Sequence, residues 1–119
     1  MTVRRMKTYA GGQGYVYQYY FVGKRAVRAG QGDPATEYIF DVTSDRKITF
    51  AVSIFLPDEA LRRWSAVHGR NLADAEQYGA VKMCLFKAFD EIEDVRSRGR
   101  ELLLDAATLE SVLGQLGIG

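Results

Sequence analysis

The hydrophobic pattern of this chain changes its period at Pro57, and this change constrains the fold more than any other feature. Before Pro57, large apolar residues occupy every second position along 48–56, with Thr49, Ala51 and Ser53 on the other face, which is the two-residue period of a strand with one buried face. After Pro57, apolar residues recur at the spacing of amphipathic helices. Strands followed by helices predict an α+β fold in which an antiparallel sheet packs against the helices.

The sheet is expected to contain four or five strands from the N-terminal half. Gly23-Lys24 fits a two-residue hairpin, because glycine readily takes the positive φ that such a turn requires. The glycine-rich segment 11–14 precedes a strand rather than a helix, so it predicts a turn and not a phosphate loop. Strands alternating with turns predict an antiparallel meander. The predicted strands cover 3–9, 15–22, 25–29, 36–42 and 47–56.

Three helices are expected in the second half, with signals at their ends. Pro57 suits a first helical turn, and Gly69 suits the residue that ends that helix. Asn71 and Asp105 are candidate N-caps of the next two helices. The apolar residues of the second helix span a wide arc, so we expect it to be covered by the sheet and also by another helix or a second subunit. The predicted helices cover 58–68, 72–94 and 106–116, and a short extra strand is predicted near 100–104.

The composition indicates one soluble domain over 1–119. Its 119 residues, 47% apolar and 26% charged, suffice for a core without metals or disulfides. No apolar run approaches the roughly 18 residues of a membrane span, and the basic N-terminus is not followed by a signal-like apolar segment. Cys84 is the single cysteine, so we expect a reducing cytoplasmic location and no disulfide.

No recognisable catalytic or metal-binding set stands out. Cys84 falls on the apolar side of the second helix, which predicts a core residue rather than a nucleophile paired with His68. The acidic segment 90–94 is followed by three arginines and matches no calcium loop, so it predicts a solvated helix face. We expect no catalytic residue, no metal site and no cofactor, and the pattern favours a protein that is not an enzyme.

The strand predicted over 15–22 is the candidate binding feature. Its aromatic residues alternate and so share one face. It lies in the first thirty residues, which hold six basic residues and no acidic one. This excess either balances the acidic remainder of the chain or forms a positive patch. The aromatic row has three interpretations: part of the core, a protein interface, or a platform for nucleic acid bases. The candidate binding residues are Tyr15, Tyr17, Tyr19, Phe21, Lys24, Arg25 and Arg28.

These patterns favour a non-catalytic protein-binding or self-assembly module, acting as a homodimer or on a protein partner. One alternative is a single-stranded nucleic-acid-binding domain that uses the Tyr-rich basic face. A second alternative is a small-ligand-binding protein with a pocket between sheet and helices, lined by Tyr38, Phe40 and Trp64. No membrane partner is expected.

Overall fold

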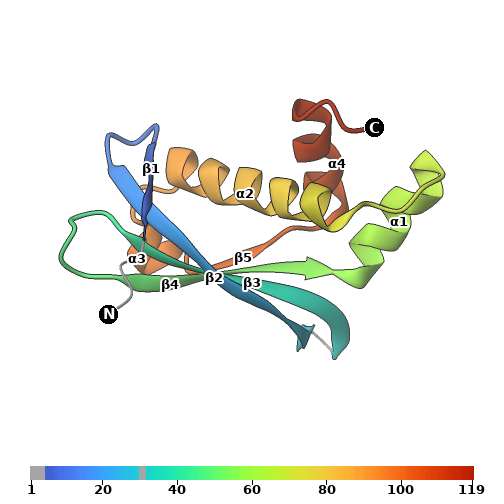
Figure 1. The fold of residues 1–119 in the computed structure, drawn as a ribbon, viewed down its shortest axis with the longest axis horizontal. Helices are drawn as coiled ribbons and strands as arrows, with labels where there is room; N and C mark the ends of the chain where they lie inside the picture. The colour runs from blue at the N-terminus through green and yellow to red at the C-terminus, as the bar shows by residue number, and fades with distance from the viewer. Residues whose placement is uncertain (1–4, 30–31) are drawn as a thin grey trace.

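The structure, a computed structural model, describes residues 5–29 and 32–119. A five-stranded sheet forms one layer, and the helices α1, α2 and α4 lie together on one side of it (Figure 1). The predicted α+β class is therefore confirmed. The elements in chain order are β1 Lys7–Ala10, β2 Val16–Ala29, β3 Asp33–Thr43, β4 Phe50–Pro57, α1 Asp58–His68, α2 Asp74–Glu91, α3 Val95–Arg98, β5 Glu101–Leu103 and α4 Ala106–Gln115.

The sheet follows the chain in the order β1-β2-β3-β4-β5. The first four strands pair antiparallel with their neighbours, which is the predicted meander. β5 reaches the far edge after α2 and α3 and pairs parallel with β4. Hydrogen bonds from Ser53 N to Arg100 O (2.8 Å) and from Leu104 N to Phe55 O (2.9 Å) hold it there. The strand predicted near 100–104 is thus present, and residues 3–4 of the first predicted strand lie outside the described residues.

The predicted hairpin at Gly23-Lys24 and its return strand 25–29 are wrong. β2 continues through both segments as one strand of 14 residues paired with β3. Phe21 pairs with Phe40 and Gly23 with Ile39, so one extra residue, Val22, forms a β-bulge between them. A glycine between apolar segments is compatible with a bulge as well as with a turn, and the long partner β3 favours the bulge.

The bulge exchanges the two faces of β2. Before it, Tyr17, Tyr19 and Phe21 face the helices; after it, Lys24 pairs with the buried Tyr38 and so lies on the helix side. Arg25 pairs with Glu37 and lies on the face turned away from the helices.

The core lies between the apolar face of β4 and the helices. Phe50, Val52, Ile54 and Leu56 are all buried there, as the alternation predicted. Ile48 was expected in the same row but is exposed. The carboxylate of Asp45 accepts hydrogen bonds from the backbone N–H groups of Lys47 and Ile48, at 2.8 and 2.9 Å, so a loop continues until Phe50.

The first and last long helices begin and end where the sequence predicted. α1 starts after Pro57 with Asp58 and Glu59 in its first turn, and Gly69 ends it with a φ of 73°. Asp105 caps α4 by accepting a hydrogen bond from Thr108 N at 2.8 Å. α4 packs on both α1 and α2.

α2 begins later and ends earlier than predicted. Ala73, not Asn71, is its N-cap residue. Glu76 stabilises this start by accepting from Ala73 N and by pairing with Arg70, both at 2.9 Å. After α2 the unpredicted short helix α3 forms, and the side chain of Asp94 caps it. None of the described helices is long and apolar enough to cross a membrane.

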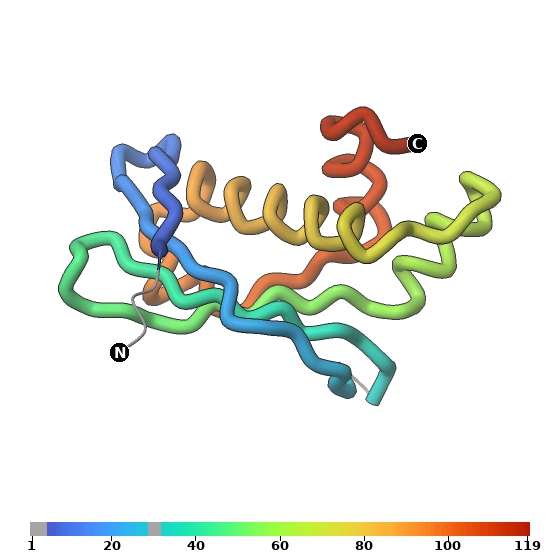
Figure 2. Tube along the Cα trace, in the orientation of Figure 1, coloured from blue at the N-terminus to red at the C-terminus, as the bar shows by residue number. Residues whose placement is uncertain are grey.

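The turn at 11–14 lies directly against the C-terminal end of α2, where the β1–β2 connection meets the helix (Figure 2). Gly11 N donates to Tyr15 O at 2.8 Å, which closes the predicted turn. A Cβ at Gly11 would lie 2.5 Å from the carbonyl oxygen of Phe89. Glycine is required here by close approach, and not for a phosphate.

Gly11→Ala tests this contact. We expect it to lower the free energy of unfolding by about 1–3 kcal/mol, because the backbone of α2 must move to admit the methyl group. Gly23→Ala is the matched control, since nothing lies within 4 Å of a Cβ there, and its effect should stay within about 0.5 kcal/mol. Urea denaturation measures both; equal effects would contradict the packing argument.

Candidate functional site

The centre of the predicted aromatic row belongs to the core. Tyr17 is 2% and Tyr19 5% exposed. The Tyr17 ring stacks on Phe89 of α2 at a centroid distance of 4.1 Å, and Tyr19 meets Phe86 edge-on at 5.5 Å. Burial raises the pKa of both phenols. Of the three interpretations of the aromatic row, the core interpretation therefore fits its two central rings.

The ends of the row differ from its centre. Tyr15 precedes β2 and is 44% exposed. Phe21 is half-buried, with its ring 5.0 Å from Tyr78 and 5.3 Å from Phe40. Stacking of successive nucleic acid bases needs a series of open rings on one surface. The described rings do not form such a series. The nucleic-acid alternative depended on an open row of rings and is therefore no longer supported by it.

The predicted basic residues are spread over two faces. Lys24 lies over the ring of Tyr38 on the helix side, with its Nζ 5.7 Å from the ring centroid. Arg25 forms an ion pair with Glu37 at 2.8 Å on the opposite face. Arg28 donates to Gly32 O at 3.1 Å. The seven candidate residues therefore do not converge on one site.

The residues that were expected to line a small-ligand pocket between the sheet and the helices do not line one. Tyr38, Phe40 and Trp64 are all buried members of the hydrophobic core, so they do not surround an opening between the sheet and the helices. The Tyr38 hydroxyl and Trp64 Nε1 have no hydrogen-bond partner among the described residues.

Cys84 and His68 have separate environments. Burial raises the pKa of the Cys84 thiol to about 11, so the thiol is protonated at neutral pH. His68 Nε2 lies 2.8 Å from the carboxylate of Glu110, and its ring stacks on Trp64 at 4.2 Å. Within the described residues, no three His, Cys, Asp or Glu side chains are grouped so that they could hold a metal ion.

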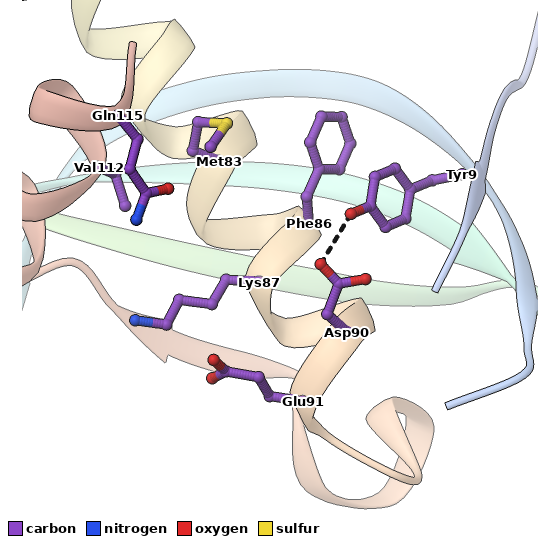
Figure 3. Close-up of a pocket in the computed structure, with 8 residues that line it drawn as sticks. All are labelled: Tyr9, Met83, Phe86, Lys87, Asp90, Glu91, Val112 and Gln115. Atoms are coloured by element: carbon purple, nitrogen blue, oxygen red, sulfur yellow. Dashed lines mark hydrogen bonds between the residues drawn. The ribbon is translucent and has the colours of Figure 1, made fainter. Parts of the chain in front are cut away.

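A groove of about 530 Å³ lies between β1, α2 and α4 (Figure 3). On one side, Tyr9 stacks on Phe86 at 4.4 Å and donates its hydroxyl to Asp90 Oδ2 at 2.8 Å. The other Asp90 oxygen accepts from Gly12 N at 3.0 Å. The hydrogen bond to Asp90 raises the pKa of Tyr9. The residues that line the groove are Tyr9, Met83, Phe86, Lys87, Asp90, Glu91, Val112 and Gln115.

Asp90 is therefore a structural residue that ties the β1–β2 turn to α2. Its neighbours Glu91, Glu93 and Asp94 are exposed, as expected for a solvated face. The remaining polar groups of the groove, Lys87, Glu91 and Gln115, combine opposite charges with an amide and specify no single ligand. No local signal could have identified the Tyr9–Asp90 contact, because 81 residues separate the two.

The face of the sheet turned away from the helices, called the outer face below, is covered by no described element (Figure 1). One row of residues that pair across neighbouring strands crosses this face. It runs from Arg25 on β2 through Glu37 on β3 and Phe55 on β4 to Leu103 on β5. Glu37 is buried in this row, and Ser53 Oγ donates to it at 2.6 Å. The Ser53 hydrogen bond and the Arg25 ion pair hold the pKa of Glu37 below its usual value, so the carboxylate is charged at neutral pH.

Apolar side chains stand beside this charged pair. Leu103 is 59% exposed and pairs with the half-buried Phe55, while Ile39 occupies the neighbouring row. An antiparallel sheet with one solvated face ordinarily carries polar residues there. The outer face combines an apolar strip on β3–β5 with a cation on β2, and this is its distinctive property.

No family model matches this sequence, and searches among curated proteins and among solved structures each found no significant match.

Tyr9→Phe tests the structural role of the Tyr9–Asp90 pair. Loss of this half-buried hydrogen bond should lower the free energy of unfolding by about 1 kcal/mol. Tyr15→Phe is the control, because the Tyr15 hydroxyl bonds to none of the described residues, and it should leave stability unchanged. Chemical denaturation of the three proteins in parallel decides the matter; equal stabilities would show that the bond contributes nothing.

Proposed function

We propose that this protein is a non-catalytic self-assembly module that forms a homodimer by packing the outer faces of two sheets together. The uncovered apolar strip around Ile39, Phe55 and Leu103 carries this proposal. Two twisted sheets pack face to face with their strands about 30° apart and side chains interdigitating across roughly 10 Å. A second copy offers an identical sheet, which supplies the missing layer.

The size of the outer face supports a weak but specific dimer. Five strands about 4.8 Å apart, with an average length of about 26 Å, give a face of roughly 600 Å². Two such faces together bury roughly 1,200 Å², at the lower end of the range for specific protein interfaces. We therefore expect association in the micromolar range rather than an obligate dimer.

In a face-to-face dimer, the charged residues of one outer face meet oppositely charged residues of the other. Arg25 lies on β2, at one side of the apolar strip, and Glu101 lies on β5 at the other side. A two-fold axis along β3 brings the β2 side of one copy over the β4–β5 side of the other. This arrangement places each Arg25 over the side of the second copy that carries Glu101, Phe55 and Leu103.

Leu103→Lys tests the dimer. We expect the unaltered protein to self-associate in sedimentation experiments over about 1–500 μM, and Leu103→Lys to weaken the dimer about tenfold or more, because a lysine replaces the most exposed apolar side chain of the strip. Val67→Lys is the matched control. Val67 is 75% exposed on α1, away from the outer face, and its replacement should leave association unchanged.

Two outcomes would overturn this proposal. One is a strictly monomeric protein across the whole concentration range. The other is a dimer that Val67→Lys weakens as much as Leu103→Lys does, which would place the interface elsewhere.

A further inference from the structure

A second candidate site lies on the helix side of the sheet, where β1 begins beside β2. There a notch of about 230 Å³ opens between the edge of the sheet and the N-terminal half of α2. Residues of β1, β2 and α2 and a residue just before β1 line the notch, and none of these lining residues carries a carboxylate. The residues that line it are Arg5, Lys7, Tyr19, Tyr20, Phe21 and Tyr78.

Lys82 brings a further cation to this notch from the next turn of α2. Its Nζ lies 5.8 Å from the ring centroid of Tyr78, which lines the notch, and 5.8 Å from that of Phe86. Burial lowers the pKa of Lys82, and the nearby charge of Lys7 lowers it further. The partly buried ammonium group of Lys82 thus lies near that of the exposed Lys7.

Within the described residues the cations of the notch have no carboxylate partner, a property that they share with Lys24 and Lys47. On this protein Arg25, Arg63 and Arg70 pair with Glu37, Glu59 and Glu76. Within residues 5–29 and 32–119, no carboxylate forms an ion pair with Arg5, Lys7 or Lys82. Among the described residues, no carboxylate therefore offsets the repulsion between Lys7 and Lys82.

We propose that this notch binds a phosphate group through Arg5, Lys7 and Lys82. A dianion between these cations turns their mutual repulsion into attraction, and the guanidinium and ammonium groups are the donors that phosphate recognition employs. Tyr19 and Tyr78 also line the notch, and a phenol hydroxyl is a donor that a phosphate oxygen can accept from. A volume of about 230 Å³ is small for an organic ligand, and it suits inorganic phosphate or the phosphate end of a larger molecule.

This site uses two of the residues that the sequence singled out, Tyr19 and Phe21, but in another role. Their rings form a wall behind the cations instead of a stacking surface. The notch lies at the β1–β2 edge of the sheet and the apolar strip lies on β3–β5, so phosphate binding and dimer formation can each fail without the other.

Calorimetric titration with inorganic phosphate, against sodium chloride of equal ionic strength, tests the proposal. We expect saturable binding of phosphate and none of chloride. Lys82→Met keeps an apolar stem among the rings and removes the charge, and it should weaken phosphate binding about tenfold or more. Lys7→Met should weaken phosphate binding to a similar extent, and Lys7 is exposed, so its replacement should not disturb the core. Lys47 is an exposed loop residue, and the Lys47→Met variant should bind phosphate as the unaltered protein does.

Phenyl phosphate distinguishes the two sources of the phosphate group. Tighter binding of phenyl phosphate than of inorganic phosphate supports the site as one for an organic phosphate, since the rings of Phe21 and Tyr78 then contribute. Equal binding supports a site for the free ion. The proposal is overturned if phosphate acts no differently from chloride, or if Lys47→Met weakens binding as much as Lys82→Met and Lys7→Met do.

Discussion

The rest of the structure depends on the aromatic contact between β2 and α2. Tyr17 and Tyr19 meet Phe86 and Phe89 across the layer boundary, with the closest rings stacked at 4.1 Å. Such contacts combine large buried areas with preferred ring geometry, so they set where the helix crosses the sheet. Once α2 is placed there, the 11–14 turn closes against its C-terminal end, and β1 and α4 leave the groove beside it.

The bulge at Val22 is the second constraint, because it decides which side chains reach each face of the sheet. Without it Arg25 would continue the row of Tyr17, Tyr19 and Phe21 on the helix side. With it Arg25 reaches Glu37 on the outer face and Lys24 lies over Tyr38. The one inserted residue therefore separates the cations that the two proposals use: Arg25 belongs to the outer face, and Arg5, Lys7 and Lys82 belong to the notch.

Much of the fold could be predicted where local signals and long-range packing agree. The alternation in β4, the Pro57 start and Gly69 end of α1, and the Asp105 cap of α4 all describe the observed elements. The errors arose where a residue had two permitted roles. Gly23 fits a turn or a bulge, Asn71 can cap but stands two residues too early, and the Asp45 loop holds Ile48 out of the strand. For the sites, the notch could not be found, because Lys7 and Lys82 come together only when α2 lies on the sheet.

The sequence by itself determined the class of the protein: a two-residue hydrophobic period before Pro57 and a helical period after it require a sheet layer and a helix layer. It also determined that Tyr17, Tyr19 and Phe21 share one face. Only the tertiary structure decided what covers that face, and which face of the sheet stays open. The physical reason is that a local pattern records which side chains point the same way, whereas their burial depends on α2, which lies more than fifty residues further along the chain.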